Sequence, residues 1–258
     1  MPRFSILIPS RLEGPGPGAL FLENAVASIR AQRLAAPPQI LVGIDAGVTA
    51  PTGLEERLGV TFVNSGGHSQ AAALNAAAAR IEGDHVALLE DDDEWNPDFL
   101  TLGLKALAEL NFISSTQLEV LPSGDVVRVN DFPTPSSWVM HRAVWDRVGG
   151  FDTSYRWHMD NDWLGRLGRT QVRRAHLAEM TAPADLNAAR SVRPLLADVL
   201  AEGRPSVTLL RHASPWPLVI RMAHPGSGIQ RILQNPELAA QSRQEQEALK
   251  RAYGCMPH

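Results

Sequence analysis

The chain has 258 residues, 44% of them hydrophobic, which is enough to bury the core of one large α/β domain. Its 28 acidic and 24 basic residues leave a formal charge of −4, so we expect no nucleic-acid partner. The single cysteine, Cys255, excludes an intramolecular disulfide and a cysteine-based zinc site, and no stretch approaches the roughly 20 apolar residues that span a bilayer. These features predict a cytoplasmic protein, with peripheral association at the inner face of the membrane left open.

Apolar runs and helical periodicity alternate along the first part of the chain. Strands are predicted at residues 4–8, 40–44, 60–63 and 85–89, and helices at 20–29, 69–79 and 97–110. A Gly/Pro-rich loop at 14–18 follows the first strand. Such alternation predicts a parallel sheet with right-handed crossovers, whose ligands collect at the carboxyl ends of the strands. Asp45 and Asp91 both fall at such ends.

The second half has a different pattern and predicts a mixed arrangement. Two apolar runs, 112–121 and 126–129, flank the turn sequence Pro122-Ser123-Gly124-Asp125, which indicates a hairpin. A helical insertion is predicted around 188–202, and an exposed terminal helix, interrupted at Pro236, around 228–253.

Four consecutive carboxylates, Glu90-Asp91-Asp92-Asp93, follow the strand predicted at 85–89. They repel one another, so this arrangement favours a divalent cation, and oxygen-only ligands suit Mg²⁺ or Mn²⁺. A cation there could bridge the phosphates of a nucleotide. The alternative is a solvated acidic loop that caps the helix begun at Pro97.

The segment 87–95 resembles the acidic DxD signature of the family 2 inverting glycosyltransferases. Other segments resemble that family in the same order: 4–10, 40–47, 64–75, 148–152, 159–162 and 218–228. The resemblance therefore extends over residues 3–230, most of the chain.

This resemblance implies an α/β fold of glycosyltransferase-A type, with a Rossmann-like, mostly parallel central sheet flanked by helices. It implies one domain at 1–230, with a nucleotide-sugar-binding half at 1–110 and a mixed acceptor half at 111–230. Residues 231–258 would form a helical tail. The four tryptophans of the acceptor half are expected mainly in the core, with stacking on a sugar ring as the alternative: Trp138, Trp145, Trp157 and Trp163.

The resemblance also implies roles for single residues. Asp45 would bind the donor's base, most often uracil, although a lone Asp at a strand end is also a common turn former. Asp93 would be the first metal ligand, joined by Asp91 and by His224, which is otherwise a structural or exposed histidine. The donor-binding residues implied are Pro9, Ser10, Asp45, Asn75, Asp91, Asp92 and Ser227.

Asp160 matches the family's general base, which removes the proton of the acceptor hydroxyl, and Asp162 is its near competitor. Both residues also suit the N-terminus of a helix, where carboxylates interact with free backbone amides. The family often has Glu-Asp where this chain has Met159-Asp160, and two aspartates with Gly-Ser where it has Asp45-Ala46-Gly47-Val48.

The function implied is metal-dependent transfer of a sugar, with inversion, from a UDP-sugar or another nucleotide sugar to a hydroxyl. The acceptor would be a saccharide, a lipid-linked molecule or another hydroxyl compound. Two alternatives stay open: a sugar-1-phosphate nucleotidyltransferase, which would want a basic, Gly-rich phosphate loop, and a catalytically silent nucleotide-sugar or glycan-binding module.

Overall fold

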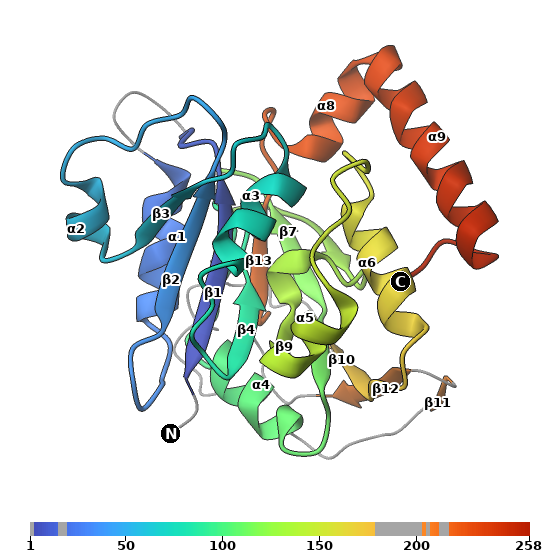
Figure 1. Cartoon of the computed structure of the whole chain (residues 1–258), viewed down its shortest axis with the longest axis horizontal. Helices are drawn as coiled ribbons and strands as arrows, with labels where there is room; N and C mark the ends of the chain where they lie inside the picture. The colour runs from blue at the N-terminus through green and yellow to red at the C-terminus, as the bar shows by residue number, and fades with distance from the viewer. Residues whose placement is uncertain (1–2, 15–19, 179–202, 205–206, 212–216) are drawn as a thin grey trace.

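A computed structural model describes residues 3–14, 20–178, 203–204, 207–211 and 217–258 (Figure 1). The helical insertion predicted at 188–202 and most of the loop predicted at 14–18 lie outside the described residues. Within the described part of the chain, no helix combines the length and the apolar character needed to cross a bilayer.

The centre of the fold is a nine-stranded sheet, counted over the described residues. Its order is β11-β12-β10-β6-β9-β4-β1-β2-β3. The strand bounds are β1 Phe4–Ser10, β2 Gln39–Ile44, β3 Thr61–Asn64, β4 His85–Leu88, β6 Phe112–Ser115, β9 Val139–His141, β10 Arg174–Ala178, β11 Gly203–Arg204 and β12 Val207–Arg211. Strands β4, β1, β2 and β3 are mutually parallel, whereas β9 runs antiparallel between β4 and β6. The predicted mostly parallel sheet is therefore confirmed.

A second sheet of four strands, with the order β5-β13-β7-β8, packs beside the first. Its strands are β5 Glu94–Trp95, β7 Gln117–Val120, β8 Val126–Asn130 and β13 Val219–Met222. The hairpin around Gly124 is present as β7 and β8. The apolar run at 112–121 forms two strands, because the chain changes sheet at Thr116, whose N–H donates to Leu177 O of β10 at 2.9 Å. β6 thus belongs to the central sheet and β7 to the second.

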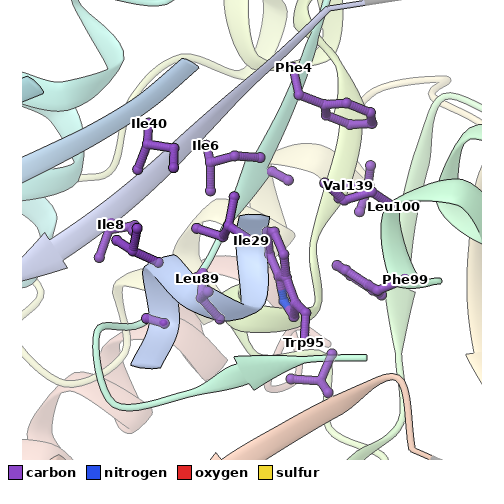
Figure 2. Close-up of a cluster of buried hydrophobic side chains, with 14 of the residues drawn as sticks. Phe4, Ile6, Ile8, Ile29, Ile40, Leu89, Trp95, Phe99, Leu100 and Val139 are labelled. Carbon is purple, nitrogen blue, oxygen red and sulfur yellow. The ribbon is translucent and has the colours of Figure 1, made fainter. Parts of the chain in front are cut away.

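Helices cover both faces of the central sheet. Helices α1 (Phe21–Arg30) and α4 (Phe99–Leu107) share one hydrophobic core with Ile6 and Ile8 of β1, and Figure 2 shows this core around Ile29, Trp95 and Phe99. On the other face, α3 (Gln70–Ala78), α5 (Arg142–Val148) and α6 (Met159–Gly168) share a second core with Leu7. Alternate residues of β1 therefore serve opposite cores, as expected for a buried strand. The short helix α2 (Leu54–Leu58) adds Leu54 and Leu58 to the first core.

Helix α3 lies very close to the sheet. A Cβ atom at Gly43 of β2 would lie 2.0 Å from the backbone oxygen of Ala73, so this strand position has room only for glycine. The alanines of α3 match this close approach because their side chains occupy little volume. The N-terminal end of α3 is thereby held near the carboxyl ends of the strands.

The chain ends in two helices, α8 (Gly228–Gln234) and α9 (Pro236–Tyr253). Asn235 separates them and caps α9, its Oδ1 accepting from the N–H groups of Glu237 at 2.9 Å and Leu238 at 3.3 Å. The predicted terminal helix with a break at Pro236 is confirmed. Figure 1 shows α9 returning along α6, with the C-terminus beside that helix.

Candidate active site

A cavity of about 700 Å³ lies at the carboxyl ends of β1, β2 and β4, with α6, β13 and α8 contributing its other walls. Eight residues singled out in the sequence line it: Pro9, Ser10, Asp45, Asp91, Asp92, Asp160, His224 and Ser227. Three others, Asn75, Asp93 and Asp162, are held by protein groups instead. The cavity thus brings together residues from both halves of the chain.

The acidic run after β4 separates its four carboxylates. Asp91 accepts from Ser10 Oγ at 2.5 Å, and Glu90 accepts from Gln70 Nε2 at 2.9 Å. Asp92 lies 2.9 Å from His224 Nε2. Donor groups on three different segments of the chain therefore contact these three carboxylates, which reduces the repulsion expected of adjacent acids.

Arg221 of β13 is the cation that this acidic run faces. Its guanidinium donates to Glu90 at 3.0 Å and to Asp93 at 3.3 Å, and lies 3.8 Å from Glu119. Burial opposes the charge of Arg221, but these carboxylates outweigh it and raise its pKa. Sequence reasoning missed Arg221; the signal was a lone arginine in the apolar segment 218–222.

Asp93 is the most deeply buried carboxylate of the acidic run. Its side chain is 1% exposed, and its oxygens accept from Ser136 Oγ at 2.6 Å, Met222 N at 3.1 Å and Arg221 Nε. Burial, more than the charges of Asp92 and Glu90, raises its pKa well above the usual range. Asp93 thus joins the acidic run to β13, while Asp92 and Glu90 face the cavity.

The pair Asp92 and His224 provides an oxygen and a nitrogen at the cavity wall. The His224 ring packs on Phe21 of α1, with 4.7 Å between ring centroids. Its hydrogen bond to Asp92 raises the pKa of His224. Oxygen atoms of Glu90, Asp92 and Asp93 lie within 4.8 Å of one another, and carboxylates with imidazole are ligands that suit Mn²⁺. The residues that could hold a divalent cation are therefore Glu90, Asp92 and Asp93, with His224 hydrogen-bonded to Asp92.

Asp160, in the first turn of α6, also lines the cavity. Burial raises the pKa of Asp160 to about 6. Its neighbour Asp162 points elsewhere: it pairs with Arg166 at 2.9 Å and accepts from Tyr253 OH at 2.8 Å. The structure therefore separates the two aspartates that the sequence left as competitors.

Asp45 and Asp91 follow β2 and β4 and line the cavity. Asp45 follows β2 and lines the cavity, half-buried, next to the Pro9–Ser10 end of β1. Burial, reinforced by the charge of Asp92, raises the pKa of Asp91 to about 7.

Asn75, which the sequence predicts to bind the donor, is hydrogen-bonded to the backbone of Phe151. Its side-chain amide donates to Phe151 O and accepts from Phe151 N, both at 2.8 Å. A Cβ at Gly150 would lie 2.6 Å from Asn75 Oδ1, so the glycine allows this close approach. Asn75 thereby links α3 to the turn that precedes α6.

Three of the four tryptophans, Trp138, Trp145 and Trp163, lie in the core around Phe151, as expected. Trp157 lines the cavity just before α6, and its indole N–H is buried without a protein partner among the described residues. Arg156 lies over its ring, 5.3 Å from the centroid. Trp157 is thus one of the aromatic residues that line the cavity, with Phe21 and Phe132.

Comparison with known structures shows the same fold in S. aureus TarS. The TarS crystal structure has a TM-score of 0.54 at 11% identity and covers 86% of this chain and 37% of its own. The structure of TarS in complex with UDP has a TM-score of 0.54 at 12% identity and covers 86% of this chain and 61% of its own. The structure of TarS in complex with UDP-GlcNAc has a TM-score of 0.51 at 12% identity and covers 87% of this chain and 60% of its own. The chain therefore spans about a third to two thirds of these structures.

No curated protein sequence matches the chain. Residues 5–161, more than half of the 258, match the family model of glycosyl transferase family 2. That match contains the acidic run and ends one residue after Asp160. With the mostly parallel sheet and the TarS-like fold, it establishes that the chain belongs to glycosyl transferase family 2.

Proposed function

We propose that this protein transfers a sugar from a nucleoside diphosphate sugar to an acceptor hydroxyl, with inversion at the anomeric carbon. The observation that carries this proposal is that one cavity is lined both by Asp160 and by the hydrogen-bonded pair Asp92 and His224. A base and a phosphate-binding pair in one cavity suit attack on a sugar held there.

The donor half would bind the nucleotide and its diphosphate. Asp45 would accept a hydrogen bond from the base, and Ser10 with Asp91 would contact the ribose at the ends of β1 and β4. Asp92 and His224 would hold a divalent cation, which when bound neutralises charge on the departing diphosphate. Ser227, three residues after His224, would contact phosphate.

Asp160 would act as the general base. Its pKa of about 6 keeps most of it ionised at neutral pH, yet leaves it more basic than an exposed carboxylate. Attack by the activated hydroxyl from the face opposite the leaving diphosphate inverts the configuration. Trp157, beside Asp160 on the cavity wall, would pack against a ring of the acceptor.

UDP is the first nucleotide to test. TarS, which shares the fold, is described in complexes with UDP and with UDP-GlcNAc. Calorimetric titration of the purified chain with UDP, GDP and dTDP, with Mn²⁺ and then with EDTA, needs no known acceptor. Metal-dependent binding of one nucleotide supports the donor site and identifies the base, whereas binding of none contradicts the proposal.

Turnover then separates a transferase from a silent module. Release of UDP from UDP-GlcNAc, with water or added saccharides as acceptor, would accompany nucleotide binding in an enzyme. Binding without turnover against soluble, saccharide and lipid-linked acceptors would favour the silent module. Association with vesicles of anionic lipid tests the peripheral membrane contact in the same preparation.

A further inference from the structure

We propose that α9 positions the general base, and that Glu245 is the residue through which it does so. This inference rests on the proposed function of Asp160. It concerns a helix outside residues 5–161, the part of the chain that the family model matches.

Glu245 holds the segment that leads into α6. Its carboxylate accepts hydrogen bonds from three consecutive backbone N–H groups, those of Arg156 at 2.9 Å, Trp157 at 2.8 Å and His158 at 3.0 Å. Hydrogen bonds to an ionised acceptor are about twice as strong as neutral ones. One side chain of α9 therefore fixes the backbone just before Asp160.

A second set of contacts surrounds Asp160 on both sides. His158 Nε2 lies 2.8 Å from Ser242 Oγ of α9, and His158 Nδ1 lies 3.1 Å from Asn161 Oδ1. Asn161 also donates to Pro257 O at 2.7 Å. Ser242 and Glu245 are three residues apart, on one face of α9. The residues before and after Asp160 are thus both held by the C-terminal segment.

The far end of α9 locks the two helices together. Tyr253 OH donates to Asp162 Oδ1 at 2.8 Å, and a Cβ at Gly165 would lie 2.6 Å from the Tyr253 ring. α6 therefore contacts α9 along much of its length. Asp162, the competitor of Asp160, belongs to this contact and acts as a positioning residue.

A general base must keep its own carboxylate free for the acceptor hydroxyl. Asp160 accepts from Asn161 N at 2.9 Å, a bond within its own turn. Its position is therefore set by the bonds of its neighbours rather than by partners of its own. Gln246 and Met256 also line the cavity, so the C-terminal segment that holds Asp160 forms part of the acceptor wall as well.

The test compares Glu245→Ala and Glu245→Gln with Glu247→Ala in the full chain. Glu247 lies on the same helix, is exposed and pairs with Lys250 at 2.9 Å, so it is a matched control. Hydrogen–deuterium exchange should show at least about tenfold faster exchange of the Arg156, Trp157 and His158 amides in Glu245→Ala. Glu245→Gln, which keeps one acceptor oxygen, should fall between Glu245→Ala and the parent protein.

Two further readouts separate positioning from stability alone. Carboxyl NMR titration of Asp160 should give a lower pKa in Glu245→Ala than in Glu247→Ala, because a loosened turn admits water. The kcat for UDP release should fall by about 10- to 100-fold, with UDP affinity unchanged. Unaltered amide exchange, or released amides with an unaltered Asp160 titration, would overturn the inference.

A failure of the proposed function can be distinguished from a failure of this inference about Glu245. If Asp160→Asn keeps full turnover, the assignment of the base is wrong. If Asp160→Asn loses turnover while Glu245→Ala keeps both its kcat and the titration of Asp160, the assignment of the base stands and the positioning role of Glu245 is wrong.

Discussion

His224 Nε2 lies 2.9 Å from Asp92 Oδ2, although 132 positions separate the two residues in the sequence. Asp92 follows β4 of the central sheet, and His224 follows β13 of the second sheet. The two sheets are joined there because β13 pairs with β5, directly after the acidic run, with Ile220 opposite Glu94. The short strand β5 thus sets the distance between the two residues that we assign to the cation.

The first prediction distinguishes Asp92 from Asp93. Asp92→Asn should weaken Mn²⁺-dependent UDP binding by at least about tenfold, because it removes a ligand that faces the cavity, and should leave the fold intact. Asp93→Asn should instead lower the free energy of unfolding by about 1–3 kcal/mol, since its amide offers Arg221 and Met222 N one acceptor oxygen where the carboxyl group offers two. Calorimetry and urea denaturation of both variants check this. An Asp93→Asn protein of normal stability but without metal-dependent binding would restore Asp93 as the ligand.

The second prediction concerns pH and metal affinity. The bond to Asp92 raises the pKa of His224, so at mildly acidic pH the ring carries the proton that a cation must displace. Mn²⁺-dependent UDP affinity should therefore rise as the pH increases past the raised pKa of His224. His224→Gln should flatten this dependence in calorimetric titrations across that range. A steep dependence that persists in His224→Gln would exclude the histidine.

The sequence predicted those parts of the site that lie directly after strands. Asp45, Asp91 and Asp92 follow buried apolar runs, and parallel strands bring their carboxyl ends to one edge. The core was predictable as well, because the spacing of apolar residues identifies the buried faces of strands and helices. These signals are local, so they need no knowledge of the tertiary contacts.

The remaining site residues depend on contacts between distant segments. Arg221 lies 128 positions from Asp93, and Glu245 lies 89 positions from Arg156. Neither has a spacing motif, since one is a lone arginine in a strand and the other one of many charges on a terminal helix. The burial of Asp93 could not be predicted because adjacent carboxylates look alike in sequence, and only the packing of β13 decides which of them is buried.

The third prediction is that Asp160→Asn loses activity and gains stability. Turnover should fall by about 100- to 10,000-fold as expected for a missing general base, with UDP binding retained. Burial raises the pKa of Asp160 to about 6, so its ionised form destabilises the fold above that pH and its neutral form does not. The free energy of unfolding of Asp160→Asn should therefore exceed that of the parent by about 1–3 kcal/mol above pH 6, and the difference should shrink as the pH falls.

Asp162→Asn is the matched control for this prediction. Asp162 pairs with Arg166 and Tyr253, so its replacement should destabilise the protein at neutral pH instead of stabilising it. Denaturation of both variants at neutral and at mildly acidic pH measures whether each replacement raises or lowers the free energy of unfolding. A stability of Asp160→Asn that is equal to the parent at every pH would show that the carboxylate is solvated in the cavity.

The fourth prediction tests Arg221 as the charge that stabilises the acidic run. Arg221→Leu leaves the buried Asp93 without a cation, so the free energy of unfolding should fall by about 3 kcal/mol at neutral pH. Without the guanidinium the pKa of Asp93 rises further, and the carboxyl protonates as the pH falls. The loss in the free energy of unfolding of Arg221→Leu should therefore be largest at high pH and shrink at low pH. This is the sign expected because the folded variant binds a proton at Asp93.

The control for Arg221 is Arg128→Leu. Arg128 pairs with Glu119 at 2.7 Å, but its side chain is 55% exposed, so its loss should change stability by no more than about 1 kcal/mol at any pH. Urea denaturation of both variants and the parent at neutral and acidic pH gives the comparison. An Arg221→Leu deficit that stays constant with pH would mean that Asp93 is already neutral beside Arg221. The ion pair would then contribute a hydrogen bond rather than the charge that holds β13 against the acidic run.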